Sequence, residues 1–200
     1  MKIAIYGYGG HAREVARSMA DYHETVFFVD DAYCCENTKP ISSFNSNEYM
    51  MMVAIGDSKL RKSVVERLPI DTMYFTFVHP TALILDNSIE IGTGSYIGPY
   101  CILTTNISIG EHALLNRGVH VGHDCRIGKY FSAMPSAVIG GNVNICDCVY
   151  LGASASVKEK INIKTPSVIG MAAAVVKDIT ESGVYTGIPA KLKKYDTHTI

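Results

Sequence analysis

The sequence predicts two different architectures in one chain of 200 residues. Residues 1–78 are expected to form a small α/β domain with a Rossmann-like parallel sheet, and residues 79–176 a parallel β-helix of hexapeptide repeats. The tail, residues 177–200, is expected to cap the last coil. Three observations support this prediction: strand-like and helix-like stretches alternate at the start, aliphatic residues then recur at every sixth position, and that period stops before the tail.

The N-terminal segment alternates short strands with helices. Apolar strands are expected at residues 2–6, 26–29, 51–55 and 73–78, with helices at residues 11–20 and from residue 58 onward. Such alternation is typical of a parallel sheet, whose ligands bind at the carboxyl ends of the strands. The residues expected to meet at that edge are Gly9, Gly10, Asp30, Asp31 and Gly56.

A redox-dinucleotide site is one interpretation of this edge. Ala12 stands where that motif has its third glycine, and the segment is only about half of a dinucleotide domain. A nucleotide or a nucleotide-linked sugar is therefore the preferred ligand. The plain alternative is a packing domain whose glycines only form a tight turn.

The middle of the chain has a period of six residues. An aliphatic residue stands at nearly every sixth position from Leu85 to Val175, and a second series four residues later is small or apolar. This period fits neither a helix nor a hairpin, and it indicates a β-solenoid. With three hexads in a coil, residues eighteen apart stack, and stacking is what stabilises such a fold because no coil buries its interior alone.

Composition excludes some partners and compartments. The net charge of −1 argues against a nucleic-acid partner held by bulk charge. The six cysteines include no CxxC pair, and no signal peptide or membrane-spanning apolar run is evident. We therefore expect a cytoplasmic protein with no membrane association.

Several motifs together resemble one family. They are the opening Gly7-Tyr8-Gly9-Gly10-His11, the pair Asp30-Asp31, the hexads, the stretch from Leu115-Asn116 to His123-Asp124-Cys125, and the closing Gly187-Ile188-Pro189-Ala190-Lys191. The sequence resembles the bacterial hexapeptide-repeat sugar acyltransferases over nearly its full length. Within them it is most similar to the group containing the UDP-4-amino-sugar N-acetyltransferases and the sialic acid O-acetyltransferases.

The resemblance implies a fold, an assembly and an activity. It implies that the β-helix is left-handed, that the protein is a homotrimer, and that acetyl-CoA lies between neighbouring solenoids, with no metal. The implied reaction is acetyl transfer to the amino group of a nucleotide-linked amino sugar, in bacterial surface-polysaccharide or glycan biosynthesis. The sugar nucleotide would dock on the N-terminal domain and reach the active site from there.

The resemblance also assigns residues. Substrate-binding positions match at Gly9, Gly10, His11, Asp30, Asp31 and Gly56, and coenzyme-binding positions at Gly141, Ser132, Ala153 and Met171. Ser132 stands where a close relative has histidine, Met171 replaces a glycine, and Ala153 replaces a larger apolar residue. Asn116 matches an active-site asparagine, although an asparagine also suits a tight corner.

His123 is the expected catalytic base. It is the third residue of the hexad 121–126, outside both inward-facing series, so it should project outward at a corner. Its imidazole titrates near neutrality and can accept a proton from an attacking amine or hydroxyl. The adjacent Asp124 could orient the ring through its other nitrogen, and the resemblance gives both residues these roles. The alternative is a solvated histidine in a turn.

The stacking rule adds a second candidate. Eighteen residues after His123 comes Gly141, one coil further, where a backbone N–H could approach a thioester carbonyl. The pair Gly140-Gly141 could equally just relieve crowding at a corner.

Three other functions remain open at this point. One is O-acetylation of sialic acid or a related sugar. Another is a zinc carbonic anhydrase of the same fold, with His112, His120 and His123 as ligands. The last is a non-catalytic binding protein, against which the pairing of His123 with Asp124 argues.

Overall fold

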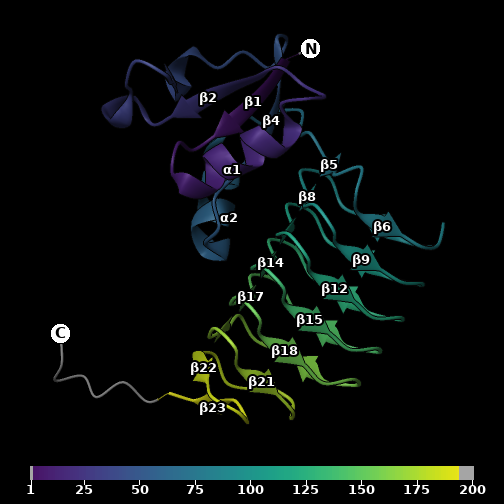
Figure 1. Cartoon of the computed structure of the whole chain (residues 1–200). Coiled ribbons are helices and arrows are strands. Elements are labelled where there is room, and N and C mark those ends of the chain that lie inside the picture. Colours follow the sequence, from purple (N-terminus) through teal and green to yellow (C-terminus); the bar gives the residue numbers. More distant parts are fainter. Residues whose placement is uncertain (1, 194–200) are drawn as a thin grey trace, which may run out of the picture.

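A computed structural model describes residues 2–193 and contains a small α/β body above a long parallel β-helix (Figure 1). This architecture confirms the predicted order of a small parallel-sheet domain and a parallel β-helix. The end of the predicted tail, residues 194–200, lies outside the described residues.

The α/β body contains a four-stranded parallel sheet in the order β3-β2-β1-β4. Its elements are β1 (Lys2–Tyr6), α1 (Gly10–Met19), β2 (Thr25–Val29), η1 (Asp31–Tyr33), β3 (Lys39–Pro40), η2 (Ile41–Ser43), β4 (Tyr49–Val53) and α2 (Ser58–Arg67). Side chains alternate between the two faces of a strand. Ile3 and Ile5 of β1 therefore pack with α1, whereas Ala4 and Tyr6 pack in a separate cluster with Val64 of α2.

One predicted strand of this sheet is divided in the structure. Within the stretch 73–78, Tyr74 makes a single bridge to Met51 of β4, whereas Phe77 and Val78 form β5 and pair with the β-helix instead. The N–H of Phe77 donates to the carbonyl of Ser95 at 2.9 Å. The chain thus passes from one body into the other within this stretch.

The β-helix has three faces of short parallel strands. Face 1 consists of β5 (Phe77–Val78), β8 (Tyr96–Ile97), β11 (Leu114–Leu115), β14 (Ser132–Ala133), β17 (Tyr150–Leu151), β20 (Val168–Ile169), β22 (Val184–Thr186) and β23 (Lys191–Leu192). Face 2 consists of β6 (Leu83–Ile84), β9 (Ile102–Leu103), β12 (His120–Val121), β15 (Val138–Ile139), β18 (Ser156–Val157) and β21 (Ala174–Val175). Face 3 consists of β7 (Glu90–Ile91), β10 (Ser108–Ile109), β13 (Arg126–Ile127), β16 (Asn144–Ile145) and β19 (Asn162–Ile163).

Strands on each face pair at an offset of eighteen residues, as the hexads predict. Ile109 pairs with Ile127 on face 3, and Val121 pairs with Ile139 on face 2. The repeated aliphatic residues fill one continuous core that is closed to solvent. Each such side chain contributes roughly 1.5–3 kcal/mol relative to exposure to water. At the far end, β22 extends face 1 and β23 returns antiparallel to it.

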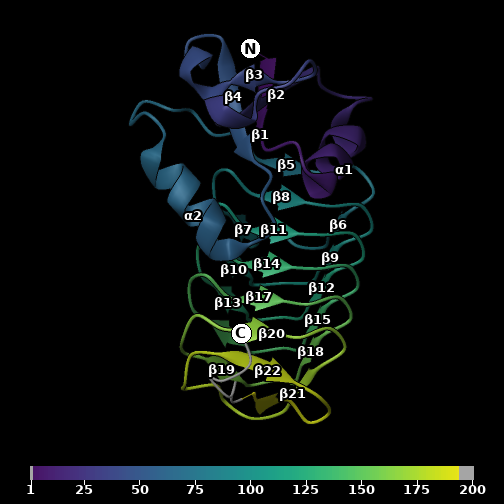
Figure 2. The same ribbon diagram turned by 90° about the vertical axis from the view of Figure 1, so that its left-hand side faces the viewer.

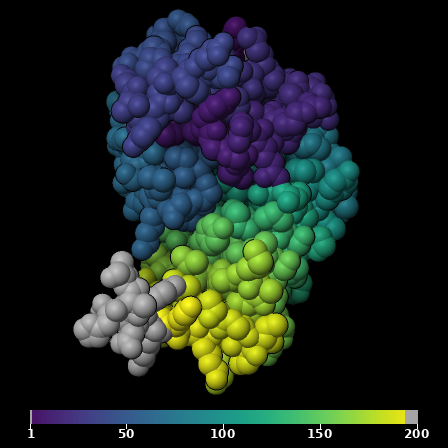
Figure 3. Space-filling model, turned by 60° about the vertical axis from the view of Figure 1, so that its left-hand side comes forward, coloured from purple at the N-terminus to yellow at the C-terminus, as the bar shows by residue number. Residues whose placement is uncertain are grey.

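The two bodies contact each other through face 1. Figure 2 shows α2 lying alongside this face, and in Figure 3 the purple and blue atoms of the N-terminal segment rest on the green atoms of the middle coils. The contact includes Arg61 of α2, which is 1 % exposed and donates to the carbonyl oxygens of Tyr130 and Phe131 beside β14.

No helix within residues 2–193 has the length and apolar character needed to cross a membrane.

Candidate functional site

His123 lies at the corner between face 2 and face 3, directly after β12, and its side chain is 57 % exposed. Its Nδ1 is 2.7 Å from Oδ2 of Asp124. An ionised carboxylate only accepts hydrogen bonds, so Nδ1 carries the proton and Nε2 is left as the acceptor. The pair therefore has the geometry of a general base with an orienting acid.

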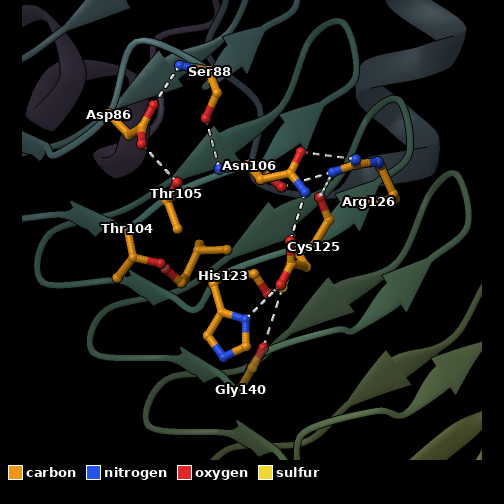
Figure 4. Close-up of polar contacts among 11 residues, drawn as sticks. Asp86, Ser88, Thr104, Thr105, Asn106, His123, Cys125, Arg126 and Gly140 are labelled. Carbon is orange, nitrogen blue, oxygen red and sulfur yellow. Dashed lines mark hydrogen bonds and ion pairs between the residues drawn. The ribbon is translucent and has the colours of Figure 1, made fainter.

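Asp124 is held at both carboxylate oxygens. Its Oδ1 accepts a hydrogen bond of 2.6 Å from Nδ2 of Asn106, one coil earlier. The hydrogen bonds from His123 and Asn106 lower the pKa of Asp124 below its usual value. The carboxylate is therefore ionised at neutral pH, the state in which it can orient the imidazole. Figure 4 shows His123, Asn106 and Arg126 in this network.

Gly141 lies beside the imidazole, where the stacking rule placed it. A Cβ added at Gly141 would fall 2.5 Å from Nε2 of His123 and 2.7 Å from its Cε1. Any side chain here would displace the ring, so the glycine is required by close approach. Its backbone N–H lies at the same corner as the free imidazole nitrogen.

A second group of predicted residues lines a pocket between α1, the loop after β4, and face 1. We call this the junction pocket. It has a volume of about 610 Å3, and its walls include His11, Glu14, Gly56, Asp57, Asn116 and Arg117. Predicted substrate residues and the predicted active-site asparagine thus converge. Asn116 is itself 5 % exposed, and its Oδ1 accepts from the N–H of Arg117.

The start of α1 suits an anionic ligand. The helix begins at Gly10 with Gly9 as its N-cap, no side chain caps it, and its first turn contains no acidic residue. Added Cβ atoms at Gly9 and Gly10 would meet nothing within 4 Å, so the helix terminus is open. Free backbone N–H groups and the helix dipole at such a terminus bind phosphate.

His11 has an unsatisfied nitrogen at this pocket. Its Nε2 is buried without a hydrogen-bond partner among the described residues. Burial lowers the pKa of His11, so the ring is neutral at neutral pH and one nitrogen can accept a hydrogen bond. An unpaired buried polar atom is costly, and a bound ligand would remove that cost.

Asp30 and Asp31 lie after β2, apart from the junction pocket. They line a separate depression of about 320 Å3. Asp30 accepts hydrogen bonds from the hydroxyl of Tyr6 at 2.6 Å and from Arg67 at 2.8 Å, and the first of these is the main reason that its pKa is lowered. Asp31 accepts from the backbone N–H of Ser42 at 3.1 Å. Both carboxylates are thus partly engaged within the chain.

The four predicted coenzyme residues do not gather at one place. Ala153 and Met171 stack with Arg117 at the corner between face 1 and face 2, where Met171 is 76 % exposed, whereas Gly141 lies at the next corner. Ser132 is fully buried, donates to the carbonyl of Gly56 at 2.7 Å and accepts from Arg61. Its hydroxyl forms hydrogen bonds between the two bodies and is closed to solvent. Ser132 therefore cannot make the predicted contact with the coenzyme in this arrangement.

The two halves of the predicted site lie at different corners of the coil. Asn116 is the first residue of the turn from face 1 to face 2, after β11, whereas His123 is the second residue of the turn from face 2 to face 3, after β12. Within one chain, the junction pocket and the histidine are therefore not brought together. A further depression of about 710 Å3, on face 3, contains none of the predicted site residues.

The sequence analysis missed several residues of these sites. Asn106 and Arg126 support Asp124, and the stacking rule could have found Asn106, which lies eighteen positions before it. The ion pair between Glu14 and Arg117 joins α1 to face 1 across the junction pocket. No sequence pattern connects those two residues.

The histidines of the zinc alternative do not form a cluster. Across residues 2–193, no group of three or more His, Cys, Asp and Glu side chains has the geometry to hold a metal ion. His112 is buried and stacked on Tyr130 with ring centroids 5.3 Å apart, and burial lowers its pKa to about 4. It packs in the junction between the two bodies, away from the corner of His123.

Comparisons with known proteins match both parts of the chain. Residues 2–68 match the family model described as the PglD N-terminal domain. The GDP-perosamine N-acetyltransferase of Escherichia coli O157:H7 is 29 % identical over 184 residues, covering 83 % of this chain and 81 % of that protein. These matches confirm the predicted resemblance to the hexapeptide-repeat sugar acyltransferases.

Two solved structures extend this likeness over the length of the acyltransferase. PerB from Caulobacter crescentus, solved in complex with CoA and GDP-perosamine, is 26 % identical with a TM-score of 0.87, covering 97 % of this chain and 98 % of that one. WeeI from Acinetobacter baumannii AYE is 28 % identical with a TM-score of 0.84, covering 96 % of this chain and 100 % of that one. The likeness confirms that the β-helix is left-handed, as the resemblance implied.

Proposed function

We propose that this acyltransferase transfers the acetyl group of acetyl-CoA to the amino group of a nucleotide-linked amino sugar, in surface-polysaccharide or glycan biosynthesis. The observation that supports it best is His123, whose Nδ1 is bound by Asp124 and whose Nε2 is free beside Gly141. The relatives that act on or bind GDP-perosamine support a sugar nucleotide as substrate.

In the proposed reaction, the amine attacks the thioester carbonyl while Nε2 of His123 accepts its proton. The tetrahedral oxyanion accepts a hydrogen bond from the backbone N–H of Gly141. Collapse of this intermediate breaks the carbon–sulfur bond, and the imidazolium returns the proton to the coenzyme A thiolate. Asp124 stabilises the charged ring throughout.

The junction pocket is the proposed sugar-nucleotide site. The N-terminus of α1 at Gly9 and Gly10 would hold the diphosphate, and the unpaired Nε2 of His11 would bond to the ligand. Gly56 and Asn116 form the facing walls, and Asp30 and Asp31 are the proposed contacts further along the strand ends. In this proposal residues 1–78 bind the sugar nucleotide, residues 79–176 carry the transfer, and residues 177–200 cap the coil.

We also propose a homotrimer, because the two halves of the site lie at different corners of one coil. A neighbouring copy could bring its own His123 to the junction pocket. Acetyl-CoA would lie between the two solenoids, along Ala153 and Met171 of one copy and Gly141 of the other.

We also propose that the protein acts in the cytoplasm. All six cysteines are free thiols, which suits that reducing compartment.

The direct test is a panel of GDP-, UDP- and dTDP-linked amino sugars incubated with acetyl-CoA, with free thiol release as the readout. We expect turnover with at least one of them, GDP-linked sugars first, and an N-acetylated product by mass spectrometry. His123→Ala should lose most of the rate while keeping its oligomeric state. Acetylation of free sialic acid alone would contradict the proposal and favour the O-acetyltransferase.

A further inference from the structure

We propose that Asn106 and Arg126 are positioning residues that fix the carboxylate of Asp124 in the orientation in which it directs His123. This inference rests on the proposed function, because it assigns a task to the network around the base. Neither residue faces the free nitrogen of the imidazole. Both act through Asp124.

The direction of each hydrogen bond follows from chemistry. A guanidinium only donates, and Arg126 donates to Oδ1 of Asn106 at 3.0 Å and to its backbone carbonyl at 2.7 Å. The Oδ1 atom of Asn106 must therefore face the arginine, which leaves Nδ2 to donate to Oδ1 of Asp124 at 2.6 Å. The arginine thus selects the one amide orientation that can support the acid.

Asp124 needs this support because it is exposed. Its side chain is 40 % accessible, and a carboxylate at a solvent-facing corner would otherwise rotate among rotamers and exchange His123 for water. With Asn106 on one oxygen and His123 on the other, the carboxylate is fixed at both ends. The ring then keeps Nδ1 protonated and Nε2 free.

The backbone holds Asn106 in place by the same stacking that builds the β-helix. Asn106 and Asp124 occupy equivalent corner positions eighteen residues apart, with left-handed φ angles of 50° and 60°. Asparagine and aspartate are among the few residues that tolerate this conformation. The N–H of Asn106 donates to the hydroxyl of Ser88 in the preceding coil at 2.8 Å.

The first test is a double-mutant cycle on purified trimer with saturating substrates. Asn106→Ala should lower kcat roughly tenfold, the order expected for losing a hydrogen bond to a charged group. In an Asp124→Ala background the same change should have less than about a twofold effect, because nothing remains for Asn106 to position. Equal factors in both backgrounds would mean a merely structural role and would overturn the proposal.

The matched control is Asn142→Ala. Asn142 lies one coil after Asp124 at the same corner position, with a φ angle of 58°. Replacing it by alanine therefore places alanine in the same unfavourable left-handed conformation as Asn106→Ala does. We expect it to change thermal stability as Asn106→Ala does and to leave kcat within about twofold. Arg126→Gln should lower kcat in the wild-type chain and have little further effect in Asn106→Ala.

A pH profile gives a readout that altered packing would not move. Asn106→Asp replaces the donor by a negative charge beside Asp124 and His123, which favours the imidazolium and should move the acid limb of kcat to higher pH. The other charged groups of this corner are Arg126, Asp86 on the coil before Asn106, and Glu159 and Lys160 two coils after His123 and Asp124, and all remain unchanged. An acid limb that stays in place would count against the proposal.

An activity-independent readout separates this inference from the proposed function. The ring-nitrogen and Cε1–H NMR signals of His123 report its tautomer and its pKa in the free protein. We expect Asn106→Ala to shift these signals, because the Nδ1–H population falls once the carboxylate of Asp124 is free to turn away. If no sugar nucleotide is acetylated but these shifts occur, the function is wrong and the positioning network stands.

Discussion

At the scale of single residues, the corner of His123 shows how close packing and reactivity depend on each other. The imidazole lies over Gly141, and its orientation is set by Asp124 on the opposite side. The lowered pKa of Asp124 means that its carboxylate stays charged as the pH falls through the range in which histidine titrates. The acid that orients the imidazole therefore keeps its charge over this range.

Gly141→Ala tests the close approach. The new Cβ would overlap the ring at 2.5 Å from Nε2, and the exposed imidazole would have to rotate away from Asp124. We expect kcat to fall by about a hundredfold, as when a general base is lost, with the melting temperature nearly unchanged. In a His123→Ala background, Gly141→Ala should not lower kcat any further. A kcat near that of the wild type would show that the ring does not need this position.

At the scale of elements, two buried side chains of α2, Arg61 and Ser58, bond this helix to the β-helix, and Arg61 makes most of these contacts. Arg61 donates to the carbonyls of Ile55 and Gly56 on its own side and to those of Tyr130 and Phe131 beside β14. Burial lowers its pKa to about 10, so it stays charged at neutral pH. The loop that forms one wall of the junction pocket is thereby fixed to face 1.

We expect Arg61→Met to destabilise the protein by about 3–5 kcal/mol, because it leaves several buried carbonyls without donors. The KM for the sugar nucleotide should rise more than that for acetyl-CoA. Denaturant unfolding and steady-state kinetics measure the two effects. Arg17→Met on α1, where the side chain is 76 % exposed, is the control and should stay within about 0.5 kcal/mol. Equal losses for both variants would refute the role of Arg61.

The sequence predicts correctly those contacts that follow from the eighteen-residue stacking of the coils. The hexads placed Ile109 over Ile127 and Gly141 beside His123 because each coil must stack on the last. Sequence reasoning could not find Arg61, since an arginine on a helix is normally exposed and its partners are backbone carbonyls from a distant coil. For the same reason it missed that Ser132 is buried between the two bodies.

At the scale of the whole molecule, the three-sided coil separates the parts of the proposed site. His123 comes seven positions after Asn116, which is one hexad plus one residue, so the two lie in successive corners. The junction pocket is fixed to face 1 by Arg61 and by the ion pair between Glu14 and Arg117. A rigid body of this kind cannot bring its own pocket to its own histidine, which is why we place the reaction between two copies.

Subunit mixing tests that arrangement. His123→Ala disables the proposed base, and His11→Ala removes the unpaired nitrogen of the junction pocket, so each variant alone should be nearly inactive. In a heterologous ring, each site takes its pocket from one copy and its base from the next. After unfolding and refolding at equal amounts, about one site in four should be intact and that share of the wild-type rate should return. A mixture as inactive as its parents, with mixed trimers verified by native mass spectrometry, would place pocket and base in one chain.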